Sequence, residues 1–149
     1  MLRQIFFGTG MSLGNIAVHA FAMVVILRSR RTVHARAPSH PMFRLIGIMI
    51  AAVSILMAAH LLEIMVWSIA YRLLDVAPAG SDALYFAFVN YTTLGYGDVL
   101  PVPRWRLLGP MTAMNGVLLF GWSTAVIFQV LWATISGEGL RKYLGGHDQ

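Results

Sequence analysis

The residue types most able to do chemistry lie in residues 92–98, which read Thr-Thr-Leu-Gly-Tyr-Gly-Asp. Glycine adopts left-handed backbone conformations without a Cβ clash, so Gly95 and Gly97 allow a backbone that alternates between ordinary and left-handed conformations. Such alternation turns successive main-chain carbonyls to one side of the strand. Rings of these carbonyls, contributed by several copies of one strand, can replace the hydration shell of a cation. The hydroxyl of Thr93 adds one more oxygen at the inner end, so this stretch predicts a cation-binding strand.

This string resembles the selectivity filter of potassium channels, which reads Thr-Val-Gly-Tyr-Gly-Asp with Val often replaced by Ile or Leu. The resemblance covers roughly residues 42–135 and implies a potassium-selective ion channel that conducts K⁺ passively. The residues that it assigns to K⁺ binding are Thr93, Leu94, Gly95 and Tyr96. Gly97 and Asp98 would support the filter, and we expect Leu94 and Tyr96 to pack against the chain's own pore helix.

The composition is that of a membrane protein. Of the 149 residues, 58% are hydrophobic and 11% are charged, whereas about a quarter are charged in soluble domains. The net charge of +5 does not predict a nucleic-acid partner, because the basic residues flank apolar spans. There is no cysteine, and the five histidines show no metal-ligand spacing in the sequence. We therefore expect no enzyme activity and no cofactor, with K⁺ only as the permeating ion and the lipid bilayer as a partner.

The expected fold is an all-α membrane protein with three transmembrane helices, a re-entrant pore helix and a filter loop. A bilayer core needs roughly 20 apolar residues, which the segments around the filter provide. The predicted units are an N-terminal helix at 1–29, a basic cytoplasmic loop at 30–41, a pore domain at 42–135 and a cytoplasmic tail at 136–149. Within the pore domain we expect an outer helix at 42–74, a pore helix at 81–92, the filter at 93–97 and an inner helix at 104–135.

Local signals support these elements. Ser81 and Asp82 are typical N-capping residues for the pore helix. That helix is too short to span, and non-helical backbone at membrane depth is tolerated only where it lines a pore or is buried in protein. Trp67, Tyr71 and Trp105 are predicted to anchor the outer membrane interface.

Arginines set the expected topology. Only Arg3 precedes the first span, and Arg28, Arg30, Arg31 and Arg36 follow it. The positive-inside rule then places the loop and the C-terminal tail in the cytoplasm and the N-terminus outside. This arrangement suits a multi-pass protein of a bacterial plasma membrane. A cleaved signal peptide is the alternative, and the position of the arginines argues against it.

One filter per chain requires four chains around an axis, so we expect a homotetramer. The resemblance implies a hinge in the inner helix at Gly116 with a second glycine at Gly121; close helix packing is the alternative for both. Helical periodicity also places Thr124 and Phe128 on a face that contains Gly121. These four residues are the gating candidates. In the N-terminal span, the spacing of Gly10 and Gly14 permits close helix approach as well.

The predicted pore helix departs from the potassium channel pattern in two respects. The family's pore helix often carries tryptophans and a glutamate that brace the filter aspartate, and here Tyr85, Phe86 and Val89 stand there. Because Phe86 cannot donate a hydrogen bond, we expect Asp98 to lack its usual partners. Asn90 stands where threonine is common. These departures keep two alternatives open: a non-conducting scaffold or regulatory subunit, and a weakly selective cation channel.

An ionisable pair lies inside the second span. His60 and Glu63 are three residues apart, so their side chains can meet on one helix face. A carboxylate within a membrane is costly and usually finds a partner in protein. The pair therefore predicts either a structural lock between helices or a proton sensor, since histidine titrates near neutral pH.

Overall fold

The computed structural model describes the backbone of residues 1–36 and 41–145, and the side chains of residues 1–28 and 42–136. Within these residues the structure is helical and contains no strand. The elements are α1 (Leu2–Arg36), α2 (Pro41–Leu73), α3 (Ala83–Tyr91), the 3₁₀ helix η1 (Pro103–Trp105) and α4 (Leu108–Gly145).

Three helices are long and apolar enough to cross a membrane, over Leu2–Arg28, Met42–Leu73 and Pro103–Ser136. The predicted all-α membrane fold is therefore confirmed. The absence of interior proline lets each span continue unbroken, since Pro110 falls in the first turn of α4, where its missing N–H is tolerated.

Two predicted boundaries come too early. α1 continues to Arg36, so residues 30–36 of the predicted loop are helical, and the remaining loop residues 37–40 lie outside the described residues. α4 continues past residue 135 to Gly145, so most of the predicted tail is helical, and residues 146–149 lie outside the described residues. The outer helix and the pore helix match their predicted ranges within two residues.

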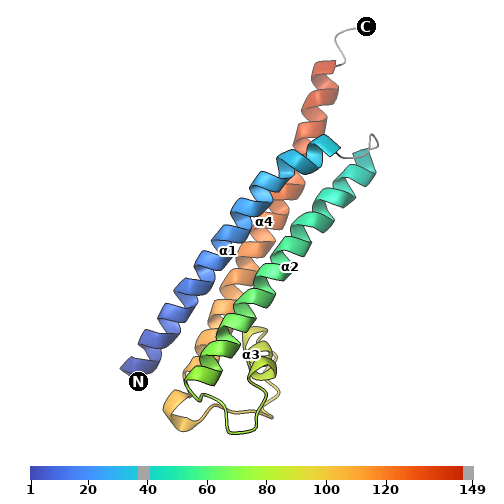
Figure 1. The fold of residues 1–149 in the computed structure, drawn as a ribbon. Coiled ribbons are helices and arrows are strands. Elements are labelled where there is room, and N and C mark those ends of the chain that lie inside the picture. Colours follow the sequence, from blue (N-terminus) through green and yellow to red (C-terminus); the bar gives the residue numbers. More distant parts are fainter. Residues whose placement is uncertain (37–40, 146–149) are drawn as a thin grey trace.

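The three long helices run side by side, and α3 lies at the end of the bundle that also holds the N-terminus (Figure 1). The C-terminal end of α4 lies at the opposite end of the bundle. α3 packs against both α2 and α4, and α1 packs against the same two long helices within its own chain. The N-terminal helix is therefore part of the pore unit's own packing rather than a separate appendage.

The glycine of α1 that lies against α4 is Gly8 and not one of the predicted pair. A Cβ added at Gly10 or Gly14 would meet no atom within 4 Å. At Gly8, by contrast, it would lie 2.4 Å from the sulfur of Met111 on α4. Gly8 therefore lies directly against the end of the Met111 side chain, which would have to move to admit a Cβ.

Two apolar clusters stack along the bundle. The first surrounds α3 and includes Trp67, Phe86, Tyr91 and Trp105. The second lies nearer the C-terminal end and joins residues of α1, α2 and α4, among them Ile26, Leu56 and Val130. On α2 and α4 the buried residues between these clusters include the polar side chains of His60, Glu63, Thr112, Asn115 and Ser123. The bundle therefore has a polar layer between two apolar ones.

The prediction that three aromatic residues anchor the membrane interface is wrong. Trp67 and Tyr71 are 0% and 1% exposed, and each bonds to α4: the Trp67 indole donates to Asn115 Oδ1 at 3.1 Å, and the Tyr71 hydroxyl lies 2.6 Å from the Thr112 hydroxyl. Trp105 is also buried, beneath the guanidinium of Arg3 at 4.4 Å from its ring. These rings pack inside the chain because α1 and α4 cover them.

Candidate functional site

The filter strand begins where α3 ends. Asp82 caps the start of α3 by accepting hydrogen bonds from Leu84 N at 2.8 Å and Tyr85 N at 3.2 Å, as predicted for this residue. At the other end, Leu94 N donates to Val89 O at 3.0 Å. Together with the bond from Thr93 N to Asn90 O at 3.0 Å, this is a Schellman motif, which ends a helix with a left-handed residue.

Backbone conformations along the strand alternate as predicted. Gly95 and Gly97 have φ values of 58° and 78°, in the left-handed region. Thr93 also has a positive φ, of 60°, because it occupies the left-handed position of the Schellman motif that glycine usually takes. The left-handed residues therefore recur at every second position, which is the pattern that directs successive carbonyls to one side.

The expectation that Leu94 and Tyr96 pack against the chain's own pore helix is wrong. Their side chains are 54% and 69% exposed, and the rest of the segment from Thr93 to Asp98 is exposed as well. A single chain therefore leaves both the carbonyl side and the side-chain side of the strand uncovered.

Asp98 has a partner, contrary to prediction. The hydroxyl of Tyr85 donates to Asp98 Oδ2 at 2.6 Å, which ties the outer end of the filter to the pore helix. Phe86, the residue on which that prediction was based, is buried and cannot donate a hydrogen bond. The neighbouring Tyr85 has the needed hydroxyl. This hydrogen bond, with the Asp98 charge, raises the pKa of Tyr85, so the phenol stays protonated and donating throughout the neutral range.

The inner helix α4 touches the pore helix at two glycines. A Cβ on Gly116 would lie 2.0 Å from Tyr91 O, and one on Gly109 would lie 3.0 Å from Asn90 Oδ1. A Cβ on Gly121 would meet nothing within 4 Å. Of the two readings of Gly116, close packing therefore has direct support, and α4 passes through both Gly116 and Gly121 without a break.

One face of α4 is open in the single chain. Thr124 and Phe128, two of the gating candidates, are exposed, as are Val117 and Trp132. The Thr124 hydroxyl bonds to Phe120 O at 3.0 Å within the helix. This face is the one that the helical period predicted.

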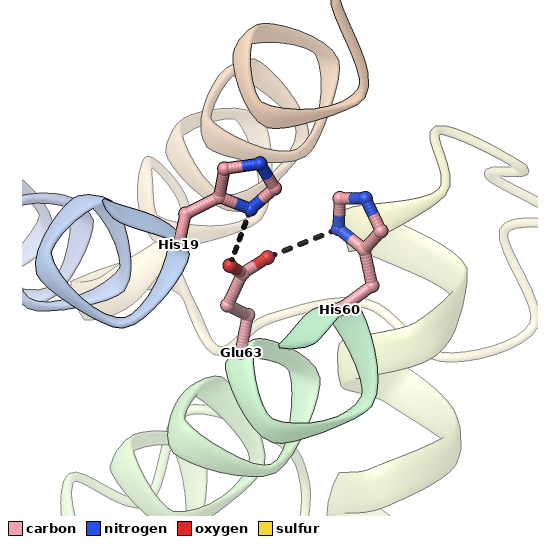
Figure 2. A group of neighbouring side chains, drawn as sticks. All are labelled: His19, His60 and Glu63. Carbon is pink, nitrogen blue, oxygen red and sulfur yellow. Dashed lines mark hydrogen bonds and ion pairs between the residues drawn. The ribbon is translucent and has the colours of Figure 1, made fainter. Parts of the chain in front are cut away.

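The buried polar layer centres on Glu63. His60 Nδ1 lies 3.0 Å from Glu63 Oε2, so the predicted contact within α2 is confirmed. The hydroxyl of Tyr91, the last residue of α3, also donates to Glu63 Oε2 and lies 2.9 Å from His60 Nδ1. From α1, His19 Nδ1 lies 2.9 Å from Glu63 Oε1 (Figure 2). Sequence reasoning found the pair on α2 and missed both His19 and Tyr91.

The far nitrogens of the two imidazoles converge on α4. His60 Nε2 lies 2.9 Å from Ser123 Oγ, and His19 Nε2 lies 3.3 Å from the same oxygen. One turn or more away, Asn15 of α1 donates to Glu63 O at 3.2 Å and to Asn115 Oδ1 at 3.0 Å. The layer thus joins α1, α2, α3 and α4.

Among the described residues, the group that could hold a metal is His19, His60 and Glu63, whose ligand atoms lie within 4.8 Å of one another. The histidines show no metal-ligand spacing in the sequence, and the fold nevertheless brings two of them to Glu63. His19 and His60 lie on different helices, so no local spacing relates them. The available signal was a histidine inside each of two apolar spans.

A family model described as ion channel matches residues 59–133, half of the chain. The chain therefore belongs to this ion channel family. The match begins one residue before His60 and ends within α4, so it contains α3, residues 92–98 and most of the polar layer. Comparisons with curated proteins and with solved structures returned no match.

The two inner-helix glycines give a matched test of packing. We expect Gly116→Ala to destabilise the protein by about 1–3 kcal/mol, because the new methyl group must displace the Tyr91 carbonyl. Gly121→Ala has room and removes a helix-unfavourable glycine, so it should be neutral or stabilising by up to about 1 kcal/mol. Thermal unfolding of the purified proteins measures both. Equal losses in the two variants would contradict the packing role.

The Tyr85–Asp98 hydrogen bond predicts a coupled pair. Tyr85→Phe should reduce ion flux partially, since the outer end of the filter loses its tie to α3. In an Asp98→Ala background the same change should have little further effect, as a double-mutant cycle on flux would show. Additive losses would mean that the two residues act separately. Because the pKa of Tyr85 is raised above its usual value, the phenol keeps its proton throughout the neutral range. The contribution of this hydrogen bond to ion flux should therefore not change from pH 5 to 8.

Proposed function

We propose that this ion channel is selective for potassium and conducts K⁺ passively through a fourfold, carbonyl-lined filter. The observation that carries the proposal is the Gly-Tyr-Gly string with left-handed backbone at Gly95 and Gly97, directly after a short capped helix. Carbonyl oxygens from Thr93, Leu94, Gly95 and Tyr96 would ligate the ion, as in the filters that this string resembles. Gly97 and Asp98 would support the strand.

Exposure in the single chain supports a homotetramer. The side chains of Leu94 and Tyr96 are not buried by their own chain. In a tetramer, neighbouring chains would cover them. The open face of α4 would then line a cavity below the filter, with Thr124 wetting it. Phe128, 66% exposed, and Trp132, 64% exposed, would narrow its far mouth, where an apolar constriction can gate by dewetting. Residues 42–135 form the pore domain in this proposal.

The dipole of α3 favours the same arrangement. The C-terminal end of α3 lies next to the filter, and a helix C-terminus carries roughly half a negative charge. Four such ends around one axis would stabilise a cation in the cavity below the filter. The Schellman motif at Thr93 ends α3, and from this point the chain would turn back toward the membrane surface.

We further propose an N-terminus on the outer side of a bacterial plasma membrane, with the arginine-rich segment after the first span in the cytoplasm. The N-terminus and the pore helix lie at the same end of the bundle, so the filter would face outward (Figure 1). The arginine asymmetry of the sequence favours this direction.

Single-cysteine labelling tests this topology, because the chain has no native cysteine. A cysteine replacing Gly80, in the turn before α3, should react with a membrane-impermeant thiol reagent added outside intact cells. A cysteine replacing Ser29, beyond the first span, should react only after permeabilisation. The reverse pattern would overturn the orientation.

The filter assignment predicts that Gly95→Ala or Gly97→Ala abolishes selective flux while tetramers still form. An added Cβ meets no clash at either residue, so the cost is the left-handed conformation itself, about 1–2 kcal/mol. Potassium-dependent rubidium uptake into vesicles that contain the purified protein measures the effect.

Gly80→Ala is the matched control. Gly80 has a φ of 85° and open space around it, so it carries the same backbone cost outside the filter. We expect this variant to keep its selectivity for potassium over sodium. Normal selectivity in the Gly95 and Gly97 variants would defeat the filter assignment, and wild-type vesicles without uptake would favour the non-conducting alternative.

A further inference from the structure

The polar layer behind the pore helix contains more acceptors than it has hydrogens to share. The contacts that close it are Glu63 with His19, His60 and Tyr91, and Ser123 with His19 and His60. A sixth contact joins His60 Nδ1 to the Tyr91 hydroxyl at 2.9 Å, and it can share the hydrogen that lies between His60 and Glu63. Each of the other five contacts needs one hydrogen between its two heavy atoms. With Glu63 ionised and both imidazoles neutral, the two imidazoles, the phenol and the serine hydroxyl supply four.

The shortfall corresponds to one positive charge. Without it, two acceptor atoms would face each other at hydrogen-bond distance, and the cluster would hold a net negative charge inside a membrane-spanning bundle. Both are costly, since His19 and Glu63 are fully buried and a buried charge must be paired. The described residues around the cluster bring no lysine or arginine to it. Two kinds of cation can supply this charge: a proton on one imidazole, or a metal ion held between the imidazoles and the carboxylate.

Ser123 determines which imidazole atoms face that cation. Its oxygen lies within reach of both Nε2 atoms, at 2.9 Å and 3.3 Å, and it has two lone pairs to accept from both N–H groups. Each imidazole then keeps its hydrogen on Nε2 and presents the Nδ1 lone pair to the Glu63 carboxylate. A hydrogen bond to the far nitrogen is how proteins orient the histidine ligands of a metal.

We propose that His19, His60 and Glu63 form a binding site for a divalent transition metal of the zinc class, with the Tyr91 hydroxyl on the fourth side. Two imidazoles and one carboxylate are a ligand set that suits zinc. Both Nδ1 atoms point to the carboxylate in Figure 2, at 2.9 Å and 3.0 Å from its oxygens. Tetrahedral zinc with bonds of about 2.0–2.1 Å holds its ligands roughly 3.3 Å apart, so the side chains need to separate only slightly.

The position of the site explains how a positive charge is accommodated there. A divalent ion with one carboxylate leaves a single positive charge, and Tyr91 is the last residue of α3, whose C-terminal end carries the negative end of its dipole. The metal would join α1 to α2 at the point where the pore helix ends. Its binding would thereby stabilise the inner end of the filter's support, independently of which ion the pore conducts.

Metal analysis of the purified full-length protein tests the proposal. After exposure to zinc chloride and removal of the excess, elemental analysis should find one zinc per chain in the wild type. His19→Ala and Glu63→Gln should lose it, and His147→Ala, which removes a histidine outside the cluster, should keep it. Cobalt should give the visible absorption of a four-coordinate site in the wild type and not in the two ligand variants.

Ser123→Ala keeps every ligand and removes only the group that orients both imidazoles. Its zinc affinity should fall by roughly 10–100-fold. If a ligand variant fails to fold, this loss of affinity is the test of the metal site. A folded wild type that takes up neither zinc nor cobalt would overturn the proposal and leave a proton as the cation. Equal zinc content in the wild type and the His19 and Glu63 variants would overturn it too.

Discussion

The carboxylate of Glu63 is the interaction on which the arrangement of this chain depends. It is fully buried in the middle of the long, mostly apolar helix α2, where an unpaired charge would cost several kcal/mol. Besides His60 on the same helix, two side chains from other helices contact it: His19 of α1 and Tyr91 of α3. Ser123 of α4 contacts the imidazoles and so joins the layer indirectly. These contacts tie the four helices to one another at the level of Glu63.

This constraint extends to the filter through Tyr91. The residue bonds to Glu63 by its side chain, and its carbonyl contacts the helix surface that Gly116 leaves open. The next residues, Thr92 and Thr93, form the C-cap and the left-handed turn into the filter strand. The inner end of the strand is therefore held from behind by the polar layer, and its outer end by the bond from Tyr85 to Asp98.

Local features of the sequence predicted much of this fold. Span length, the capping Asp82 and the left-handed glycines of the filter depend on residues close in sequence, so each could be inferred correctly. The polar layer could be inferred only in part. His60 and Glu63 are neighbours on one helix, whereas His19 and Ser123 reach them across helices, a relation that no local spacing contains.

The errors have a common physical origin. Trp67 and Tyr71 were assigned to the membrane interface because aromatic residues favour that depth, yet both are buried by α4. Asp98 was expected to lack a partner because one position, Phe86, was judged alone. In each case the tertiary neighbours decided the outcome, and α1 in particular added contacts that a two-helix pore unit lacks.

Potassium selectivity is the central claim, and the reversal potential of purified channels in a planar bilayer tests it most directly. With a potassium gradient across the bilayer balanced by an opposite sodium gradient, the account predicts a current that reverses close to the potassium equilibrium potential. A reversal potential near zero would show that the two ions permeate alike and would contradict a selective carbonyl filter.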